Sequence, residues 1–125
     1  MLKRVLVVDD DDELRETLWE ALSYCNFQVK LMVDGSRLAE AINIFKPDLI
    51  LLDYMLPGIN GGELCEKIKN DPATSDLPVI LMSAYQDVFE HFQCCSKILY
   101  KPFDLDKLLE VINDHLIDDS IPDNP

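Results

Sequence analysis

Short runs of large apolar residues recur along the chain, and stretches with a different periodicity separate them. The runs occupy residues 3–8, 27–32, 49–52, 79–82 and 98–100. Consecutive aliphatic and β-branched residues, bounded by turn residues or acids, are typical of strands that are buried on both faces of a parallel sheet. The pattern therefore predicts five strands.

Between these runs, apolar residues return every three or four positions, which is the spacing of one helix face. Helical patterns cover residues 12–22, 38–45, 64–68, 87–94 and 105–116, the last being the clearest and the fourth the weakest. The first helix is expected to start at Asp11 or Asp12, since an acid there can cap the first turn. The second must end before Pro47.

Strand and helix alternate five times, and no internal repeat interrupts the order. Because crossovers between parallel strands are right-handed, this order predicts a doubly wound α/β fold with helices on both faces of a parallel sheet. The length of 125 residues fits one domain. We expect that domain at residues 1–117, and a flexible acidic tail or the start of a linker at residues 118–125.

The charge balance is strongly acidic, with 24 acids against 11 bases and a net charge of -13. Such a surface repels phosphate backbones and anionic lipid, so direct binding to nucleic acid or to a membrane is not expected. No apolar run reaches the length of a membrane span, and the N-terminus opens into a strand without a signal-peptide pattern. These features predict a cytoplasmic protein.

Four cysteines fit that location. Cys25, Cys65, Cys94 and Cys95 form no C-x-x-C pair and no zinc spacing. Adjacent cysteines rarely bond to each other because of disulfide geometry. We expect free and mostly buried thiols, with an exposed reactive thiol at Cys94 or Cys95 as the alternative.

Unusual polar residues follow four of the five predicted strands. They are Asp9, Asp10, Asp53, Ser83 and Lys101. Taken singly, an acid before a helix is usually a cap, a serine after a strand a turn residue, and a lysine before proline a solvated side chain. The carboxyl ends of parallel strands meet at one edge of a sheet, where ligands collect. The coincidence at four strand ends therefore predicts a functional site.

Three carboxylates at this edge repel one another. At about 5 Å and an effective dielectric near 20, each pair costs about 3 kcal/mol, so the cluster needs cations. Lys101 supplies one positive charge, and Mg²⁺ held by Asp9, Asp10 and Asp53 is expected to supply the rest. A carboxylate beside Mg²⁺ can attack a phosphoryl group, and Asp53 is the candidate nucleophile. Ser83 can then donate a hydrogen bond to a phosphoryl oxygen.

Four stretches of the chain together resemble the receiver domains of two-component response regulators. They are VLVVDD at residues 5–10, PDLILLDYMLPGINGGE at 47–63, PVILMSA at 78–84 and KPF at 101–103. The resemblance covers nearly the whole chain. It implies a flavodoxin-like sheet with strand order 2-1-3-4-5, an order for which a chemotaxis receiver is a known example.

The resemblance also implies roles for the strand-end residues. Asp53 would accept phosphate from a histidine kinase or a phosphotransfer protein, and Ser83 and Lys101 would contact the phosphoryl group. The implied metal ligands are Asp9, Asp10, Asp53 and the backbone carbonyl of Met55. On this interpretation the chain is a signalling phospho-acceptor that catalyses only its own phosphorylation and dephosphorylation, and not a metabolic enzyme.

Switching is implied as well. Phosphate at Asp53 would draw Ser83 inward and rearrange a surface made by the segments at 87–94, 98–100 and 105–116, which would contact an unknown output protein or domain. The domain would be a monomer or a phosphorylation-dependent dimer. Receivers usually carry an aromatic residue three positions before the lysine, where this chain has Ile98.

Tyr100 lies two residues after Ile98, so strand alternation places both on one face. Tyr100 either substitutes for the missing aromatic residue or is simply a packed tyrosine. The segment between Ser83 and Lys101 is shorter than usual in the family, which predicts a short or irregular helix there.

A phosphate-independent interaction module with a receiver-like fold stays an alternative. An aspartyl-phosphate phosphatase is disfavoured, because such enzymes have a second acid two residues after the nucleophile, where this chain has Met55. A calcium loop from Asp9 would need glycine at its sixth position, which is Leu14. We expect His91 and His115 to be solvated surface residues.

Overall fold

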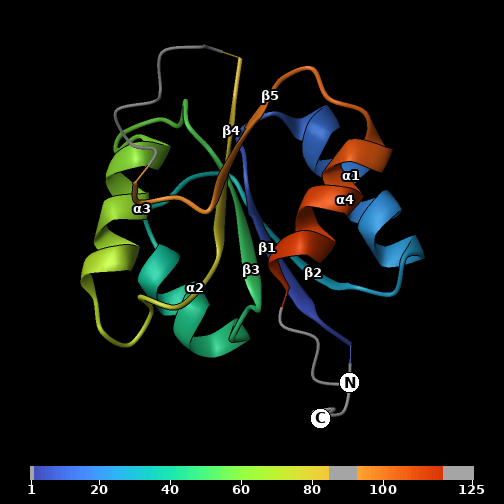
Figure 1. The fold of residues 1–125 in the computed structure, drawn as a ribbon. Helices are drawn as coiled ribbons and strands as arrows, with labels where there is room; N and C mark the ends of the chain where they lie inside the picture. Colours follow the sequence, from blue (N-terminus) through green and yellow to red (C-terminus); the bar gives the residue numbers. More distant parts are fainter. Residues whose placement is uncertain (1, 85–92, 117–125) are drawn as a thin grey trace, which may run out of the picture.

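The computed structural model describes residues 2–84 and 93–116. The strands are β1 (Arg4–Val8), β2 (Gln28–Met32), β3 (Leu49–Asp53), β4 (Val79–Ser83) and β5 (Lys97–Tyr100), and the helices are α1 (Asp12–Tyr24), α2 (Leu38–Phe45), α3 (Gly61–Asn70) and α4 (Leu105–His115). All strand pairs are parallel, and the sheet order is β2-β1-β3-β4-β5 (Figure 1). The five predicted strands and their expected order are confirmed.

The sheet is covered on both sides. Figure 1 shows α2 and α3 on one face and α1 and α4 on the other. Alternate residues of β1 and β3 face opposite layers: Leu6 and Ile50 pack on the α2 and α3 side, and Val7 and Leu51 pack on the other. Each fully buried aliphatic side chain contributes about 1.5–3 kcal/mol, so runs that are apolar at every position favour this two-sided burial.

Helix starts follow local capping. The carboxylate of Asp11 accepts hydrogen bonds from the backbone N–H groups of Glu13 and Leu14, at 3.0 and 3.3 Å, and caps α1. Asp104 caps α4 by accepting from the backbone N–H of Lys107 at 2.8 Å. The predicted start of the first helix at Asp11 or Asp12 is therefore confirmed.

The third helix begins earlier than its apolar pattern indicates. α3 starts at Gly61, although the two glycines at 61 and 62 suggest a turn. Asn60 explains the difference, because its side-chain oxygen accepts from the backbone N–H of Glu63 at 2.9 Å and its amide donates to the Glu63 carboxylate at 3.0 Å. Asn60 is therefore the N-cap of α3, and its amide also holds the Glu63 side chain over the first turn.

Some predictions fall outside the described residues. These are residues 87–92 of the fourth helical pattern, His91 and the tail at 118–125. The remaining two positions of that pattern, Gln93 and Cys94, lie in a turn. In the two described ranges, no helix combines the length and the apolar character that crossing a bilayer requires.

Candidate functional site

The sheet topology brings the acids together. Asp9 directly follows β1, and Asp53 is the last residue of the neighbouring strand β3. Asp9, Asp10 and Asp53 each offer a carboxylate oxygen, and these oxygens lie within 4.8 Å of one another. Asp9 and Asp53 are buried, whereas Asp10 is exposed. The cluster is thus open to solvent on the Asp10 side.

Asp9 is held firmly in place by backbone groups. One of its carboxylate oxygens accepts a hydrogen bond from the backbone N–H of Asp11 at 2.9 Å. Its own backbone N–H donates to the carbonyl of Met32 at 3.0 Å, and its carbonyl accepts from the Arg15 guanidinium at 2.7 Å. Arg15 also forms an ion pair with the exposed Asp12. The carboxylate of Asp9 is therefore fixed before any ligand binds.

Lys101 places a positive charge between two carboxylates. Its Nζ lies 2.9 Å from Oδ2 of Asp9 and 3.3 Å from Oδ1 of Asp53. Its backbone N–H donates to the carbonyl of Ser83 at 2.7 Å, which positions the lysine at the end of β5. Burial lowers the pKa of Lys101, but the hydrogen bond to Asp9 and the two negative charges outweigh it, so the pKa is raised overall.

The electrostatics of Asp53 differ from those of a surface acid. Burial, and then the charge of Asp9, raise the pKa of Asp53 to about 6, against the opposing effects of Lys101 and of the backbone N–H of Met55. A carboxylate of raised pKa is more basic and a better nucleophile than an ordinary one. Without a further cation, the negative charge of ionised Asp53 is only partly balanced.

The loop after β3 folds tightly over Asp53. The backbone N–H of Gly61 donates to the carbonyl of Tyr54 at 2.8 Å, and the N–H of Tyr54 donates to Met82 at 2.8 Å. A Cβ atom at Gly61 would lie only 2.2 Å from the carbonyl oxygen of Asp53. Glycine is therefore required at position 61. The side chain of Met55 is 53% exposed beside this loop.

Ser83 and Tyr100 are neighbours across β4 and β5, where they are register partners. Ser83 is fully buried at the end of β4. Ile98 and Tyr100 belong to the same apolar cluster, Ile98 within it and Tyr100 packed against it. The predicted shared face of Ile98 and Tyr100 is confirmed.

Several other side chains lie outside the acidic cluster. Trp19 is 48% exposed, and His115 is partly buried, with Nδ1 2.8 Å from the carbonyl oxygen of Val111. None of the four cysteines, all of which lie in the described ranges, forms a disulfide; Cys25 is exposed and the others are buried or partly buried. The contact of Arg15 with the backbone carbonyl of Asp9 was not predicted. The sequence pointed to it only through the position of Arg15, in the first turn of a helix that starts beside the acids.

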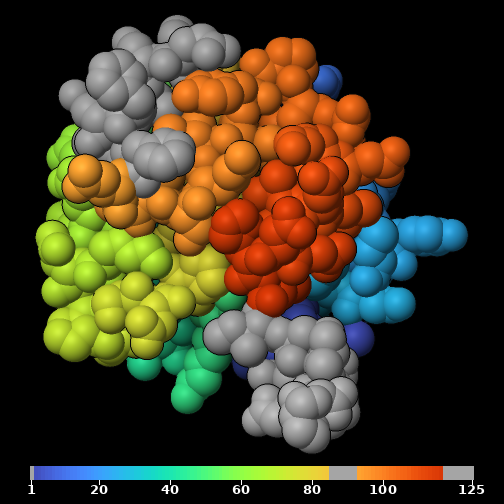
Figure 2. Space-filling view, viewed as in Figure 1, coloured from blue at the N-terminus to red at the C-terminus, as the bar shows by residue number. Residues whose placement is uncertain are grey.

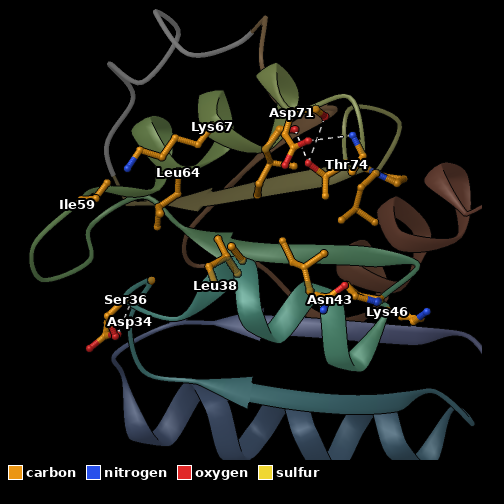
Figure 3. A pocket seen from close by; sticks show the side chains of 18 of the residues that line it. Asp34, Ser36, Leu38, Asn43, Lys46, Ile59, Leu64, Lys67, Asp71 and Thr74 are labelled. Carbon is orange, nitrogen blue, oxygen red and sulfur yellow. Dashed lines mark hydrogen bonds between the residues drawn. The ribbon is translucent and has the colours of Figure 1, made fainter.

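A separate hollow lies between α2 and α3 (Figure 3). Its volume is about 1040 Å³, and its walls include Leu38 and Leu64, which approach from the two helices. None of the three clustered carboxylates lines it. The hollow is therefore distinct from the acidic site.

Comparison with known proteins gives a consistent picture. The family model described as "Response regulator receiver domain" matches residues 5–113. The regulator RpaA of Synechocystis sp. is 33% identical over 86% of this chain and 46% of its own length, and MtrA of Mycolicibacterium smegmatis is 39% identical over 72% and 38%. The chain spans about half or less of the length of these curated relatives.

Solved structures agree. A response regulator from Chloroflexus aurantiacus has a TM-score of 0.85 at 28% identity and covers 92% of this chain and 98% of its own. TrrA of Thermotoga maritima, solved in complex with Mg²⁺-BeF, has a TM-score of 0.82 at 29% identity, covering 92% and 100%. RpaA and MtrA are both named as DNA-binding, so the relatives give no support to the expectation that nucleic acid is not contacted directly.

Proposed function

Because this chain belongs to the response regulator receiver domain family, we propose that it is the phospho-acceptor of a two-component phosphorelay, with Asp53 as the phosphorylated residue. One observation supports this assignment above the others. Three carboxylates converge within 4.8 Å, and Lys101 bridges two of them. An acidic cluster with one fixed cation suits a reaction that brings further negative charge to the same place.

Asp53 is the proposed nucleophile. A carboxylate oxygen of Asp53 attacks phosphorus, the O–P bond forms, and the bond from phosphorus to the donor's histidine nitrogen breaks with its electron pair returning to that nitrogen. The raised pKa of Asp53 supports this role, because the carboxylate is more basic than a surface acid. Asp9 is already anchored by Asp11 and is less suited to form a bond.

The acidic residues fit a hard divalent cation. Their donor set consists of carboxylate oxygens, which Mg²⁺ prefers. Asp9, Asp10 and Asp53, with the backbone carbonyl of Met55, would hold the ion. When bound, Mg²⁺ supplies positive charge that stabilises the phosphoryl oxygens in the transition state.

Lys101 and Ser83 complete the proposed phosphoryl site. The Lys101 ammonium is already within 3.3 Å of Asp53 and can pair with a phosphoryl oxygen there. Ser83 ends β4, and the carbonyl of Ser83 accepts from the Lys101 backbone. The Ser83 hydroxyl would donate to the phosphoryl group. Ser83 would thus be connected, through this backbone hydrogen bond, to Lys101 at the end of β5.

We further propose that this link transmits phosphorylation to a surface made by β5, α4 and the residues between β4 and β5. Tyr100 is the proposed substitute for the aromatic switch residue, because it pairs with Ser83 across the two strands. A histidine kinase or phosphotransfer protein would donate the phosphoryl group in the cytoplasm, and an output protein or domain would bind the rearranged surface, as a monomer or a phosphorylation-dependent dimer.

Phosphorylation by acetyl phosphate tests the proposal. Intact mass is measured for the wild type and Asp53→Asn, each with Mg²⁺ and with EDTA. We expect one added phosphate in the wild type with Mg²⁺ and none in the other three samples. Asp10→Asn is the matched control, since it weakens the metal site and leaves the nucleophile; slower labelling that excess Mg²⁺ restores is expected.

The opposite result has a definite meaning. If no sample gains phosphate, and beryllofluoride with Mg²⁺ causes no change in the NMR spectrum of the wild type, the phospho-acceptor proposal is wrong. A phosphate-independent interaction module with a receiver fold would then be the better description.

A further inference from the structure

Three of the four cysteines meet on the side of the sheet opposite α1 and α4. Cys65 lies in α3 and is fully buried, while Cys94 and Cys95 lie in the turn that leads into β5. Cys65 and Cys95 belong to the apolar cluster beneath α3, and Cys94 packs against that cluster. Figures 1 and 2 show the start of the orange segment beside the green α3. Cys25, at the end of α1, is exposed.

Contacts identify one pair within this group. The Sγ of Cys94 lies 3.9 Å from the carbonyl oxygen of Gly62, in the first turn of α3. Cys65 follows Gly62 by three residues, about one helical turn, so this contact places the Cys94 thiol beside the face of α3 that carries Cys65. Two cysteines in one cluster can be joined where their geometry allows it, and a turn accommodates the required movement more easily than a helix does. The pair is also well separated in sequence.

The other possible pairings and uses are less favourable. Cys94 and Cys95 are adjacent, which disfavours a bond between them. Among the residues that the structure describes, only Asp9, Asp10 and Asp53 form a three-residue group compact enough to hold a metal ion. A thiolate metal site is therefore not supported.

We propose that Cys65 and Cys94 are a redox modification site, where a low-molecular-weight disulfide such as oxidised glutathione converts the two thiols into a reversible disulfide. Cys94, which is only partly buried, reacts first. Its thiolate attacks the reagent, forms a mixed disulfide and releases one glutathione thiolate. Cys65 then attacks the Cys94 sulfur and displaces the second glutathione.

The balance of this reaction is complete. Two protein thiols lose two electrons and two protons, one S–S bond forms between Cys65 and Cys94, and one oxidised glutathione becomes two reduced glutathione molecules. No metal or further oxidant is needed. Reduced glutathione in excess reverses both steps.

Local electrostatics support this order of attack. Burial raises the pKa of both thiols, but the interaction between them acts in opposite directions, raising the pKa of Cys65 and lowering that of Cys94. Lys69 lowers both values, while Glu66 raises that of Cys94. Cys94 is thus the better nucleophile of the two, and the buried Cys65 is the resolving thiol.

A bond here would join α3 to the turn before β5. Ser96 in this turn donates its backbone N–H to Val79 at 2.8 Å, so the turn sets the first pairing of β5 with β4. A disulfide would therefore fix this turn, residues 93–96, against α3. An effect of the disulfide on signalling rests on the proposed function. Formation of the disulfide itself does not depend on that function.

Oxidation of a Cys25→Ser variant tests the site without interference from the exposed thiol. The protein is incubated with oxidised glutathione, without Mg²⁺ or phosphodonor, and analysed by intact mass and by a non-reducing peptide map. We expect a loss of two hydrogen atoms and a peptide that joins Cys65 to Cys94. Reduction with dithiothreitol should restore the original mass.

Second substitutions in the same background assign the two steps. Cys94→Ser should give no adduct, Cys65→Ser should accumulate one glutathione on Cys94, and the matched control Cys95→Ser should still form the disulfide. A bond that maps to Cys95, or no bond in the folded Cys25→Ser protein, would overturn the proposal. Acetyl phosphate labelling of the reduced protein is scored separately, so failure of either proposal is recognised independently.

Discussion

The Nζ of Lys101 lies 2.9 Å from Oδ2 of Asp9 and 3.3 Å from Oδ1 of Asp53. The two acids come from neighbouring strands, β1 and β3, and the lysine follows an edge strand, β5. The ammonium group of Lys101 therefore balances part of the negative charge of Asp9 and Asp53. Removing that group should have effects that a surface lysine does not have.

Lys101→Met is expected to destabilise the protein by about 2–4 kcal/mol in EDTA, because it leaves the fully buried Asp9 without its cation. Mg²⁺ should recover part of the loss by replacing the missing charge. Urea unfolding with and without Mg²⁺ measures both effects. The matched control is Lys107→Met, whose ion pair with Glu110 is exposed at 3.8 Å and should contribute less than about 1 kcal/mol. Equal losses in the two variants would contradict the charge-compensation argument.

Mg²⁺ affinity is expected to rise with pH through the range centred on the pKa of Asp53, about 6. Burial and Asp9 raise this pKa, so Asp53 keeps its proton in mildly acidic solution, and Mg²⁺ must displace that proton to bind. Affinity should therefore be weaker below this pH and level off above it. Isothermal titration at a series of pH values measures the slope.

Asp53→Asn serves as the control for that titration. Its amide does not ionise, so the variant should bind Mg²⁺ more weakly and with a flatter dependence over the same range. An unchanged slope in the variant would assign the pH dependence to another group.

Gly61→Ala is expected to destabilise the protein by more than about 2 kcal/mol, since the new Cβ would lie 2.2 Å from the carbonyl oxygen of Asp53 and the loop must move. Labelling by acetyl phosphate should fall with it. Gly58→Ala is the matched control: its φ of +79° costs about 1–2 kcal/mol for a residue with a Cβ, but no atom lies within 4 Å of that Cβ. Thermal unfolding ranks the two variants, and a smaller loss for Gly61→Ala would refute the steric argument.

Asp11→Ala should cost about 1 kcal/mol of stability through loss of the α1 cap. Mg²⁺ affinity should change little, because the group that Asp11 offers to Asp9 is its backbone N–H, which alanine keeps. Chemical denaturation and Mg²⁺ titration separate these two effects. Asp12→Ala, which removes an exposed first-turn acid, should lower stability by less than Asp11→Ala. A large loss of Mg²⁺ affinity in Asp11→Ala would mean that its side chain acts on the site.

The strands and the acidic cluster could be predicted for a common physical reason. Runs such as residues 49–52 are apolar at every position, which only two-sided burial satisfies, and parallel strands end at one edge. Asp9, Asp53 and Lys101 were therefore expected at the same edge of the sheet once the five strands were recognised. The strand order that places β1 beside β3 was implied by the resemblance to receiver domains.

Features that depend on side-chain reach were not predictable in this way. The start of α3 depends on Asn60 pairing with Glu63, which outweighs the low helix propensity of two glycines. The contact between Arg15 and the carbonyl of Asp9 depends on the rotamer of a long side chain. The approach of Cys94 to α3 depends on how the chain returns to the sheet, which no local pattern encodes.

The position of each site residue within the sheet also has a dynamic consequence. β3 is paired on both sides and buried throughout, so its amides should exchange with deuterium at the rate of global unfolding. β5 is an edge strand that is paired only with β4, so Lys101 follows a strand that opens more readily than β3 does. The proposed nucleophile, Asp53, is therefore attached to a central, rigid strand, while the charge that faces it, on Lys101, lies next to an edge strand that can open separately.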